Sequence, residues 1–390
     1  MNAEGVVQGQ ESAFPKEEYE KRQAHARAGL ERAGLDALII TGPENIFYLT
    51  GQQTPGYYTF QALVLSAQGD PVFVIRQLEY FNFIANTFIA DAEIYQDHEE
   101  PISFLTKVIE RKGLSGKRVA IDKRGWFLPI AVYETLQSTL GEIHDGAGII
   151  EALRAIKSPQ EVEKLEIAAS YVDSGMRAGL AAVRSGASDN DLVAAMMEAA
   201  IRAGSEYMGM EPLVSTGRRT GVPHGTWRRT PLSDNDPAFL EMAGVHDRYH
   251  AALMRSAWVG PVPQEAEDMM KACQDALAAS LAEIRPGVAC EVPHMACQKV
   301  IDAAGYTENF RKRLGYSVGI SFAPDWGEGA ILSLNAGVKT ELQPGMTFHL
   351  PPALRIYGKF TVGVSETIVI TETGWRQLGS VPRELTRVAA

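Results

Sequence analysis

The chain has few cysteines, no long hydrophobic run and no excess of positive charge. Its three cysteines, Cys273, Cys290 and Cys297, are widely spaced and odd in number, which argues against a disulfide framework or a zinc cluster and fits a reducing cytoplasm. No segment approaches the roughly 18 apolar residues that a transmembrane helix needs, and the polar, acidic N-terminal residues lack the apolar stretch of a secretory signal. We therefore expect a cytoplasmic protein with no membrane partner.

The charge balance argues against nucleic acid as a partner. The formal net charge is −11 at pH 7, whereas binding to phosphate backbones requires a basic surface. Local basic groups such as Arg311-Lys312-Arg313 are too short to form a stripe and are typical of solvated loops. With 390 residues, of which 45% are hydrophobic and 22% charged, the chain is long enough for two globular domains that act on a small molecule.

Helical and strand-like patterns alternate over residues 1–157. Residues 16–33 have the helical spacing of small and apolar side chains, and the same spacing returns at residues 102–111 and 128–140. Short apolar runs predict buried strands at residues 35–40, 62–65, 71–75 and 118–121, with a turn at residues 69–71. Strands mixed with helices predict an α/β domain over residues 1–157.

From residue 158 the pattern changes to paired helices and antiparallel-looking strands. Ser158, Pro159 and Glu161 have the spacing of a capping box and predict a helix that begins there. Further helical patterns cover residues 189–203, 264–284 and 292–304, and strand-like runs cover residues 238–243, 251–259, 347–350 and 367–371. These elements predict an α+β domain over residues 158–390.

Four sequence blocks stand out at and after the boundary between these domains. They are LRAIKSPQEVEKLEIAASYVD at residues 153–173, Pro223-His224-Gly225, the strand pair at residues 237–260, and the last strands at residues 342–348 and 366–374. In this order they resemble the creatinase, prolidase and methionine aminopeptidase superfamily. The resemblance implies a pita-bread fold, which is an antiparallel sheet wrapped by helices with the site on its concave face. It also implies a homodimer in which the N-terminal domain reaches toward the partner's site.

Metal-dependent members of this superfamily hold two divalent ions with two aspartates, one histidine and two glutamates. The resemblance places Glu241, Ala252, Tyr316 and Pro351 at the first four of these positions, and either Ser365 or Glu366 at the fifth. At most two ligand side chains remain, and neither alanine nor proline offers a side-chain donor to a metal. The resemblance therefore implies a branch without a metal or other cofactor, similar to ectoine hydrolase and creatinase.

The superfamily histidine that exchanges a proton with the substrate falls on His224. With Glu241 and Glu366 it forms a set of one imidazole and two carboxylates, the kind of set with which creatinase holds a cationic guanidinium. Imidazole titrates in the range that general acid–base catalysis needs, and carboxylates bind cationic C–N groups through charge-assisted hydrogen bonds. These residues predict a metal-independent hydrolase of the C–N bond in a small amidine, guanidine or amide.

Polar and aromatic residues in or beside the sequence blocks are candidates for binding the substrate. Tyr249, His250, Tyr316 and His349 can orient a substrate or a water molecule, and Trp326 can stack on a cationic ring. Arg76 follows a predicted strand of the N-terminal domain and is a candidate for binding a substrate carboxylate across the dimer. Each of these residues is also consistent with an ordinary structural role.

Two other functions fit the same sequence. One is a metal-dependent Xaa-Pro dipeptidase or aminopeptidase that uses unusual ligands. The other is a non-catalytic binding protein that keeps the pocket without the chemistry. Within the hydrolase hypothesis, the sequence leaves open which substrate is bound and whether Glu241 forms a covalent intermediate.

Overall fold

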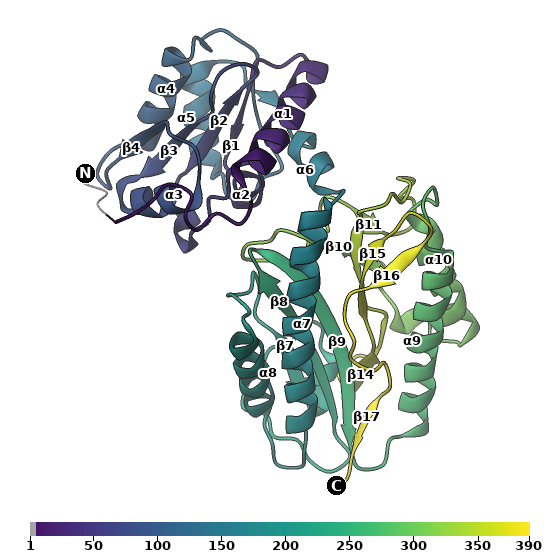
Figure 1. The fold of residues 1–390 in the computed structure, drawn as a ribbon. Coiled ribbons are helices and arrows are strands. Elements are labelled where there is room, and N and C mark those ends of the chain that lie inside the picture. The colour runs from purple at the N-terminus through teal and green to yellow at the C-terminus, as the bar shows by residue number, and fades with distance from the viewer. Residues whose placement is uncertain (1–4) are drawn as a thin grey trace. The chain divides into compact units, whose positions relative to one another are not determined.

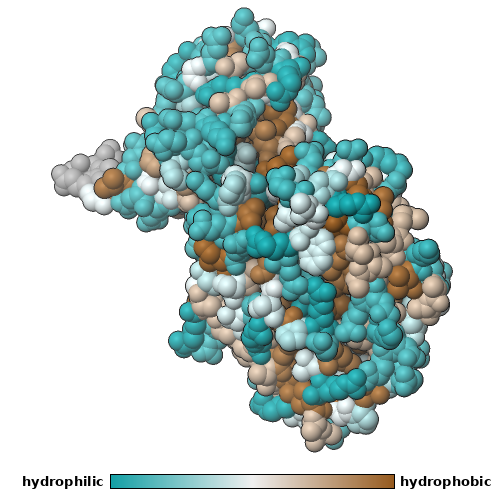
Figure 2. Space-filling view, turned by 45° about the vertical axis from the view of Figure 1, so that its right-hand side comes forward, coloured by the Kyte–Doolittle hydropathy of each residue, from teal (hydrophilic) through white to brown (hydrophobic). Residues whose placement is uncertain are grey.

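The computed structural model describes residues 5–390 and divides the chain into two compact units, Met1–Arg154 and Ala155–Ala390 (Figure 1). We call them the N-terminal and the C-terminal unit. Within residues 5–390, no helix combines the length and the apolar character that crossing a membrane requires. On the face shown in Figure 2, hydrophilic side chains predominate and hydrophobic ones form smaller areas between them. Such a surface is usual for a globular protein.

The N-terminal unit is built on a six-stranded mixed sheet with the order β4-β3-β2-β1-β5-β6. Gly69, in the left-handed conformation (φ 82°), turns the chain between the antiparallel strands β2 and β3. The strands are β1 (Ala37–Ile40), β2 (Ala62–Ser66), β3 (Val72–Arg76), β4 (Ala92–Tyr95), β5 (Val119–Ile121) and β6 (His144–Asp145). The helices are α1 (Lys16–Ala33), α2 (Pro43–Thr50), α3 (Tyr80–Asn86), α4 (Pro101–Arg111), α5 (Ile130–Leu140) and α6 (Ile149–Arg154), with the 3-10 helices η1 (Pro55–Tyr58) and η2 (Gln77–Glu79). The predicted α/β architecture is confirmed.

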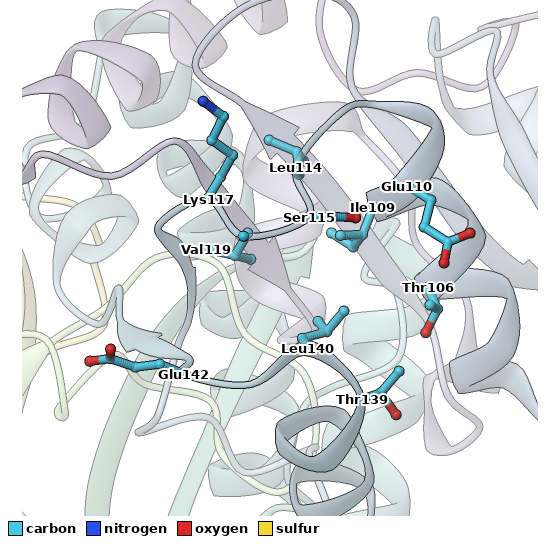
Figure 3. A pocket seen from close by; sticks show the side chains of 11 residues that line it. Thr106, Ile109, Glu110, Leu114, Ser115, Lys117, Val119, Thr139, Leu140 and Glu142 are labelled. Atoms are coloured by element: carbon cyan, nitrogen blue, oxygen red, sulfur yellow. The ribbon is translucent and has the colours of Figure 1, made fainter.

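Figure 3 shows a small pocket of the N-terminal unit between α4, β5 and α5. Its volume is about 140 Å³, and the side chains around it include Ile109, Leu114, Lys117, Leu140 and Glu142. None of its lining residues belongs to the sequence blocks at residues 153–374. Apart from Arg76, the candidate site residues of the sequence lie in the C-terminal unit.

One half of the C-terminal unit is a four-stranded sheet covered by two helices. The sheet has the order β17-β9-β8-β7, in which β17 runs parallel to β9 and the other pairs are antiparallel. Figure 1 shows α7 lying along β8 and β9. The elements are α7 (Pro159–Ala182), α8 (Asp189–Ala203), β7 (Leu213–Thr216), β8 (Pro237–His246), β9 (Tyr249–Val259) and β17 (Thr386–Val388), with the 3-10 helix η3 (Gly217–Gly221) after β7.

The other half combines two packed helices, α9 and α10, with a five-stranded antiparallel sheet of order β11-β10-β12-β15-β16. A separate hairpin, β13–β14, contacts β8 and β9 through β14. The elements are α9 (Gln264–Glu283), α10 (Glu291–Ala303), η4 (Thr307–Asn309), β10 (Gly315–Ser317), β11 (Ser333–Leu334), β12 (Thr347–Leu350), β13 (Ala353–Ile356), β14 (Phe360–Gly363), β15 (Glu366–Ile370) and β16 (Trp375–Gln377).

The strands of the C-terminal unit form two sheets and a hairpin, where the resemblance implies one continuous antiparallel sheet. β15 and β9 belong to different sheets, and single hydrogen bonds join them in place of a regular β-ladder. The Ser365 N–H donates to Met254 O, and the Thr367 hydroxyl donates to Ala252 O. These bonds hold the two halves together without a paired ladder between them.

Alternation along β8 decides which side chains reach the site. Leu240 and Met242 are fully buried with Val172 and Met176 of α7 in one apolar core. Because successive side chains of a strand point to opposite faces, Glu241 points away from the helices. We call this side of β8 and β9 the inner face, and it carries Phe239, Glu241, Ala243, Ala252 and Met254.

The first helix of the C-terminal unit begins as predicted. Ser158 Oγ accepts a hydrogen bond from the N–H of Glu161 at 3.3 Å, and the Glu161 carboxylate accepts one from the N–H of Ser158 at 2.9 Å. Pro159 occupies the first turn. The capping box is therefore confirmed, and it fixes the start of α7.

Lys157, just before α7, makes a buried ion pair. Its Nζ donates to Glu328 Oε2 at 2.6 Å and lies 3.2 Å from Ser317 Oγ, and both charged side chains are 1% exposed. The N–H of Lys157 also donates to Gly345 O. These bonds connect the start of α7 to β10 and to the loop that leads into β12.

We expect Lys157→Met to destabilise the C-terminal unit by about 3–5 kcal/mol, because it removes the cation from a buried carboxylate. Lys339→Met is the control, since Lys339 pairs with Glu291 at an exposed position and such pairs contribute little. Urea unfolding followed by tryptophan fluorescence measures both changes. Equal unfolding midpoints for the two variants would contradict a structural role of the buried pair.

Candidate functional site

Glu241 lies on the inner face between two small apolar clusters. In the strand register it is opposite Leu213 on β7 and Met254 on β9. Within residues 5–390, no protein group donates a hydrogen bond to its carboxylate. The apolar neighbours are Phe239, Met254 and Ala353 in one cluster and Leu213, Ala243, Ala252 and Trp326 in the other.

Two cations lie near enough to Glu241 to affect the pKa of its carboxyl group. Burial raises the pKa of Glu241 from its ordinary value of 4.5, and the charges of Lys312 and then Arg355 oppose that rise. Burial lowers the pKa of Lys312 and of Arg355, and the charge of Glu241 opposes both changes. Nε of Arg355 is buried and has no hydrogen-bond partner in the described chain. The site therefore combines one carboxylate with two cations.

Sequence reasoning missed Lys312 and Arg355 as site residues. Arg355 lies two residues after Ala353 on β13, and Ala353 packs on the inner face, whereas Leu354 is buried on the helix side. A charged residue that interrupts an apolar strand is a signal that could have identified Arg355. Lys312 gave no such signal, because it lies in the loop between η4 and β10 within a short basic run.

Four side chains of the site form a connected polar network, which we call the tyrosine network (Trp326, Tyr316, His349 and Ser365). Trp326 Nε1–H donates to Tyr316 Oη at 2.9 Å. His349 Nδ1 lies 3.0 Å from Tyr316 Oη, and His349 Nε2 lies 2.7 Å from Ser365 Oγ. Burial lowers the pKa of His349 to about 3, so its imidazole is neutral. The structure thus brings together the predicted residues Tyr316, Trp326 and His349, and adds Ser365.

Glu366 does not join Glu241. Its carboxylate is fully buried and lies 3.1 Å from Arg255 Nη2 and 2.9 Å from Arg383 Nε. Neighbouring residues of an extended chain point to opposite faces, and Ser365 is the one that joins the tyrosine network. The expected pairing of Glu241 with Glu366 is therefore corrected: Glu366 is a counter-ion inside the protein.

His224 lies on an exposed turn between η3 and β8, with a left-handed backbone (φ 54°). The nearby Thr220 is hydrogen-bonded to Thr361 on β14, and the β13–β14 hairpin also carries Arg355. No hydrogen bond within residues 5–390 joins His224 to Glu241. The expected role of His224 in proton transfer stays a prediction.

Two of the predicted substrate-binding residues are bonded inside the fold. His250 is fully buried; its Nε2 accepts from the Gly209 N–H at 3.0 Å, and its Nδ1 donates to Arg248 O at 2.8 Å. Burial lowers the pKa of His250 well below 6.5, which keeps it neutral. Tyr249 donates to the Glu161 carboxylate at 2.8 Å. Both contacts favour structural roles, and the expectation that these residues bind the substrate stays a prediction.

Arg76 ends β3 in the N-terminal unit and has an acidic partner there. Its Nε and Nη2 lie 2.5 Å and 2.7 Å from the two carboxylate oxygens of Asp97. This two-point bond raises the pKa of Arg76 and lowers the pKa of Asp97. A substrate carboxylate would have to displace Asp97, and the expected role of Arg76 stays a prediction.

The side chains at the superfamily's metal positions do not fit a pair of metal ions. Ala252 and Pro351 offer no donor, the Tyr316 hydroxyl belongs to the tyrosine network, and Glu366 is paired with arginines. Among residues 5–390, no group of three or more His, Cys, Asp and Glu side chains is arranged to hold a metal ion. Glu241 therefore lacks the companion ligands that two neighbouring divalent ions need.

The sequence matches two family descriptions over most of its length. Metallopeptidase family M24 matches residues 163–372, and the creatinase/prolidase N-terminal domain matches residues 22–156. Ectoine hydrolase of Halomonas elongata is 30% identical over 393 residues, which cover 95% of this chain and 98% of that protein. An uncharacterized hydrolase/peptidase of Sinorhizobium fredii is 29% identical over 387 residues, which cover 95% and 98% of the two chains.

Solved structures share the fold. The prolidase of Thermococcus sibiricus matches with a TM-score of 0.86 at 21% identity, over 95% of this chain and 99% of that chain. Dipeptidase PepE of Mycobacterium ulcerans matches with a TM-score of 0.83 at 24% identity, over 97% and 100%. These likenesses confirm the predicted fold class.

We expect Glu241→Gln to stabilise the fold at neutral pH. The pKa of Glu241 is raised in the folded protein, so the unfolded chain releases this proton at a lower pH than the folded protein does. Stability is therefore lost as the pH rises from the ordinary pKa of 4.5 through the raised pKa, and the loss is complete above both. Glutamine removes this loss. The melting temperature of the variant should exceed that of the wild type at about pH 7, and the difference should shrink toward pH 4.5.

Glu366→Gln is the matched variant. Burial raises the pKa of Glu366 as well, but its loss leaves the buried Arg255 cation uncompensated, so the expected sign is opposite. It removes the carboxylate from Arg255, whose side chain is 1% exposed. Breaking a buried pair in this way costs about 3–5 kcal/mol. Calorimetric melting temperatures of the wild type and both variants, measured from about pH 7 down to pH 4.5, give the change in stability for each variant. A loss of stability in Glu241→Gln as large as in Glu366→Gln would contradict the isolated position of Glu241.

Proposed function

The chain belongs to metallopeptidase family M24 and is a hydrolase of that family, within which we propose that it cleaves a C–N bond in a small substrate without a metal ion. The substrate class is an amidine, a guanidine or an amide that also carries an anionic group. The residues of the C-terminal unit that support this proposal are Glu241, Lys312 and Arg355, and His224 is the proton-transfer residue that the superfamily resemblance implies.

The isolated carboxylate of Glu241 carries the proposal. Glu241 is partly exposed, and desolvation raises its pKa. A partly desolvated carboxylate without a protein donor is costly to ionise, and a substrate that presents N–H groups supplies such donors. Such charge-assisted hydrogen bonds are stronger than neutral ones. Lys312 and Arg355, near the same carboxylate, can bind an anionic group at the other end of the substrate.

In the proposed reaction, Glu241 holds the nitrogen side of the C–N bond and His224 is the general base. Water adds to the carbon of the C–N group while His224 takes one of its protons. The C–N bond then breaks, and His224 returns the proton to the leaving nitrogen. The exposed turn that carries His224 has to bring its imidazole to the bound substrate.

The relative from Halomonas elongata supports a compact zwitterionic substrate. Ectoine is a cyclic amidine that bears a carboxylate, so one molecule presents a group for Glu241 and a group for Lys312 and Arg355. At 30% identity, the likeness favours this class of compound without fixing the compound itself. Ectoine, hydroxyectoine, creatine and small N-acyl amino acids form the set of substrates to test.

A metal-dependent Xaa-Pro dipeptidase is the second candidate function. It is favoured by the likeness to the prolidase of Thermococcus sibiricus, with a TM-score of 0.86. It would need metal ligands other than the side chains now at the superfamily positions. A non-catalytic binding protein is the third candidate, and the homodimer and the cytoplasmic location stay predictions.

We expect hydrolysis to survive the removal of metal ions. Enzyme dialysed against EDTA and 1,10-phenanthroline should keep its rate, and added Mn²⁺ or Co²⁺ should leave that rate unchanged, because the ligand positions do not form a metal site. Metal analysis of the dialysed protein is the control. A rate that vanishes with chelator and returns with Mn²⁺ would replace this proposal with the metal-dependent peptidase.

We expect His224→Ala to lower the turnover number by about 10²–10⁴-fold, the usual contribution of a positioned general base. His25→Ala is the control, because His25 is an exposed histidine on α1 of the N-terminal unit. The measurement is the steady-state rate with the preferred compound of the set. If His224→Ala and His25→Ala both turn over at the wild-type rate, another group is the base.

A further inference from the structure

The tyrosine network ends in a fixed hydrogen-bond donor on each side. The indole of Trp326 can only donate, and so can the N–H of Met254. Tyr316 Oη accepts from Trp326 at 2.9 Å, and Ser365 Oγ accepts from the Met254 N–H at 2.7 Å. The directions of the inner bonds are therefore constrained from both ends.

Counting hydrogens leaves two possible arrangements. The neutral imidazole of His349 carries one N–H, and the hydroxyls of Tyr316 and Ser365 carry one O–H each. Only two bonds, Tyr316–His349 and His349–Ser365, join these three groups. One hydrogen must therefore point out of the network, and it belongs to either Ser365 or Tyr316.

Burial decides between the two arrangements. Ser365 is 0% exposed, and in residues 5–390 its hydroxyl contacts only His349 and the Met254 N–H. A hydrogen of Ser365 that pointed elsewhere would be an unsatisfied buried donor, which costs about 1–3 kcal/mol. Tyr316 is only partly buried and packs against the apolar cluster that contains the inner-face residues Ala243 and Ala252. The favoured arrangement is Ser365 O–H to His349 Nε2, and His349 Nδ1–H to Tyr316 Oη, with the Tyr316 O–H directed into the site.

We propose that Tyr316 is a fixed hydrogen-bond donor to the reacting oxygen of an amide substrate, with His349 and Ser365 as positioning residues. The proposal rests on the hydrolase function proposed above and narrows its substrate class. Burial raises the pKa of Tyr316, and the charge of Glu241 raises it further. The phenol therefore stays protonated and keeps its donor at neutral pH.

A fixed donor discriminates among the three substrate classes. An amide presents a carbonyl oxygen, which accepts a hydrogen bond from Tyr316, and an N–H, which donates to Glu241. The C–N group of an amidinium or a guanidinium presents only N–H donors, so Tyr316 would face it donor to donor. Lys312 and Arg355 supply the site for a free carboxylate. The geometry therefore points to an N-acyl amino acid.

Tyr316 has a defined task in the hydrolysis of such a substrate. Water adds to the carbonyl carbon, His224 takes the water proton, and the carbonyl oxygen becomes an oxyanion that accepts the Tyr316 hydrogen bond. The carbonyl then re-forms, the C–N bond breaks, and His224 returns the proton to the leaving nitrogen. The donor stabilises the charge that develops in the transition state, which is where such a bond accelerates a reaction.

We expect Tyr316→Phe to lower kcat for an N-acetyl amino acid by about 10²–10³-fold with KM near the wild-type value, the loss typical of removing one oxyanion donor. Tyr171→Phe is the matched control, because the Tyr171 hydroxyl lies 3.4 Å from His246 Nδ1 and outside the tyrosine network. It should turn over at the wild-type rate. A fall in kcat no larger for Tyr316→Phe than for Tyr171→Phe overturns the donor role.

The positioning role of Ser365 is tested by a double-mutant cycle. Ser365→Ala should lower kcat with KM unchanged, and should add nothing to the loss in Tyr316→Phe, because it acts through the same hydroxyl. A merely structural role of Ser365 would instead give additive losses. Melting temperatures of the three variants check that each one is folded.

Substrate preference separates this inference from the proposed function. Wild-type enzyme should hydrolyse N-acetyl amino acids faster than ectoine or creatine, and the reverse order would overturn the amide assignment while leaving a C–N hydrolase. If no compound is hydrolysed, the proposed hydrolase function fails. The donor role of Tyr316 is then tested by measuring how tightly an N-acetyl amino acid binds. Calorimetric titration with an N-acetyl amino acid should then show binding about tenfold weaker in Tyr316→Phe. Equal or absent binding overturns the donor role.

Discussion

A carboxylate that finds no hydrogen-bond donor within the described protein is the constraint on which the chemistry of this site depends. Alternation along β8 puts Leu240 and Met242 into the helix-side core and leaves Glu241 on the inner face. Burial works against its charge, and Lys312 and Arg355 offset this only in part. Because Glu241 is partly exposed, a ligand that presents N–H groups can reach it and supply the donors that the protein does not.

Tyr316, Ser365 and Glu366, which lie at or beside the superfamily's metal positions, are bonded to other groups of the protein, although Oε2 of Glu366 is buried without a hydrogen-bond partner in residues 5–390. Tyr316 and Ser365 are joined through His349, and Glu366 is held by two arginines. In the Glu366 pair, burial raises the pKa of the carboxyl and lowers the pKa of Arg255. The desolvation of the two charges therefore exceeds their mutual attraction. Removing one partner would destabilise the fold further, because the other charge would stay buried without a counter-ion. Such a pair fixes geometry rather than adding stability. Glu241 and the outward hydrogen of the tyrosine network are the groups that the proposal assigns to the C–N group of the substrate, with Lys312 and Arg355 assigned to its anionic end.

The helices and strands that could be predicted from the sequence are those with a clear local pattern of polar and apolar residues. Elements with a clear polar and apolar period, such as α7 with its capping box, were predicted closely, whereas α2 was missed because nearly all its side chains are buried. The side chains of Tyr316 and His349 were predicted at the site, but Glu366 was not separable from Ser365, because a shift of one residue reverses the face. Lys312 comes from the loop between η4 and β10, which is positioned by tertiary packing that no local pattern records.

Anomalous diffraction from wild-type crystals soaked with Mn²⁺ and an N-acetyl amino acid tests the central claim most directly. That claim is that Glu241 binds the substrate and not a metal ion. We predict no manganese peak beside Glu241, with the ligand nitrogen at Glu241 and the carbonyl oxygen at Tyr316. Two manganese peaks coordinated by Glu241 and neighbouring side chains would contradict the claim.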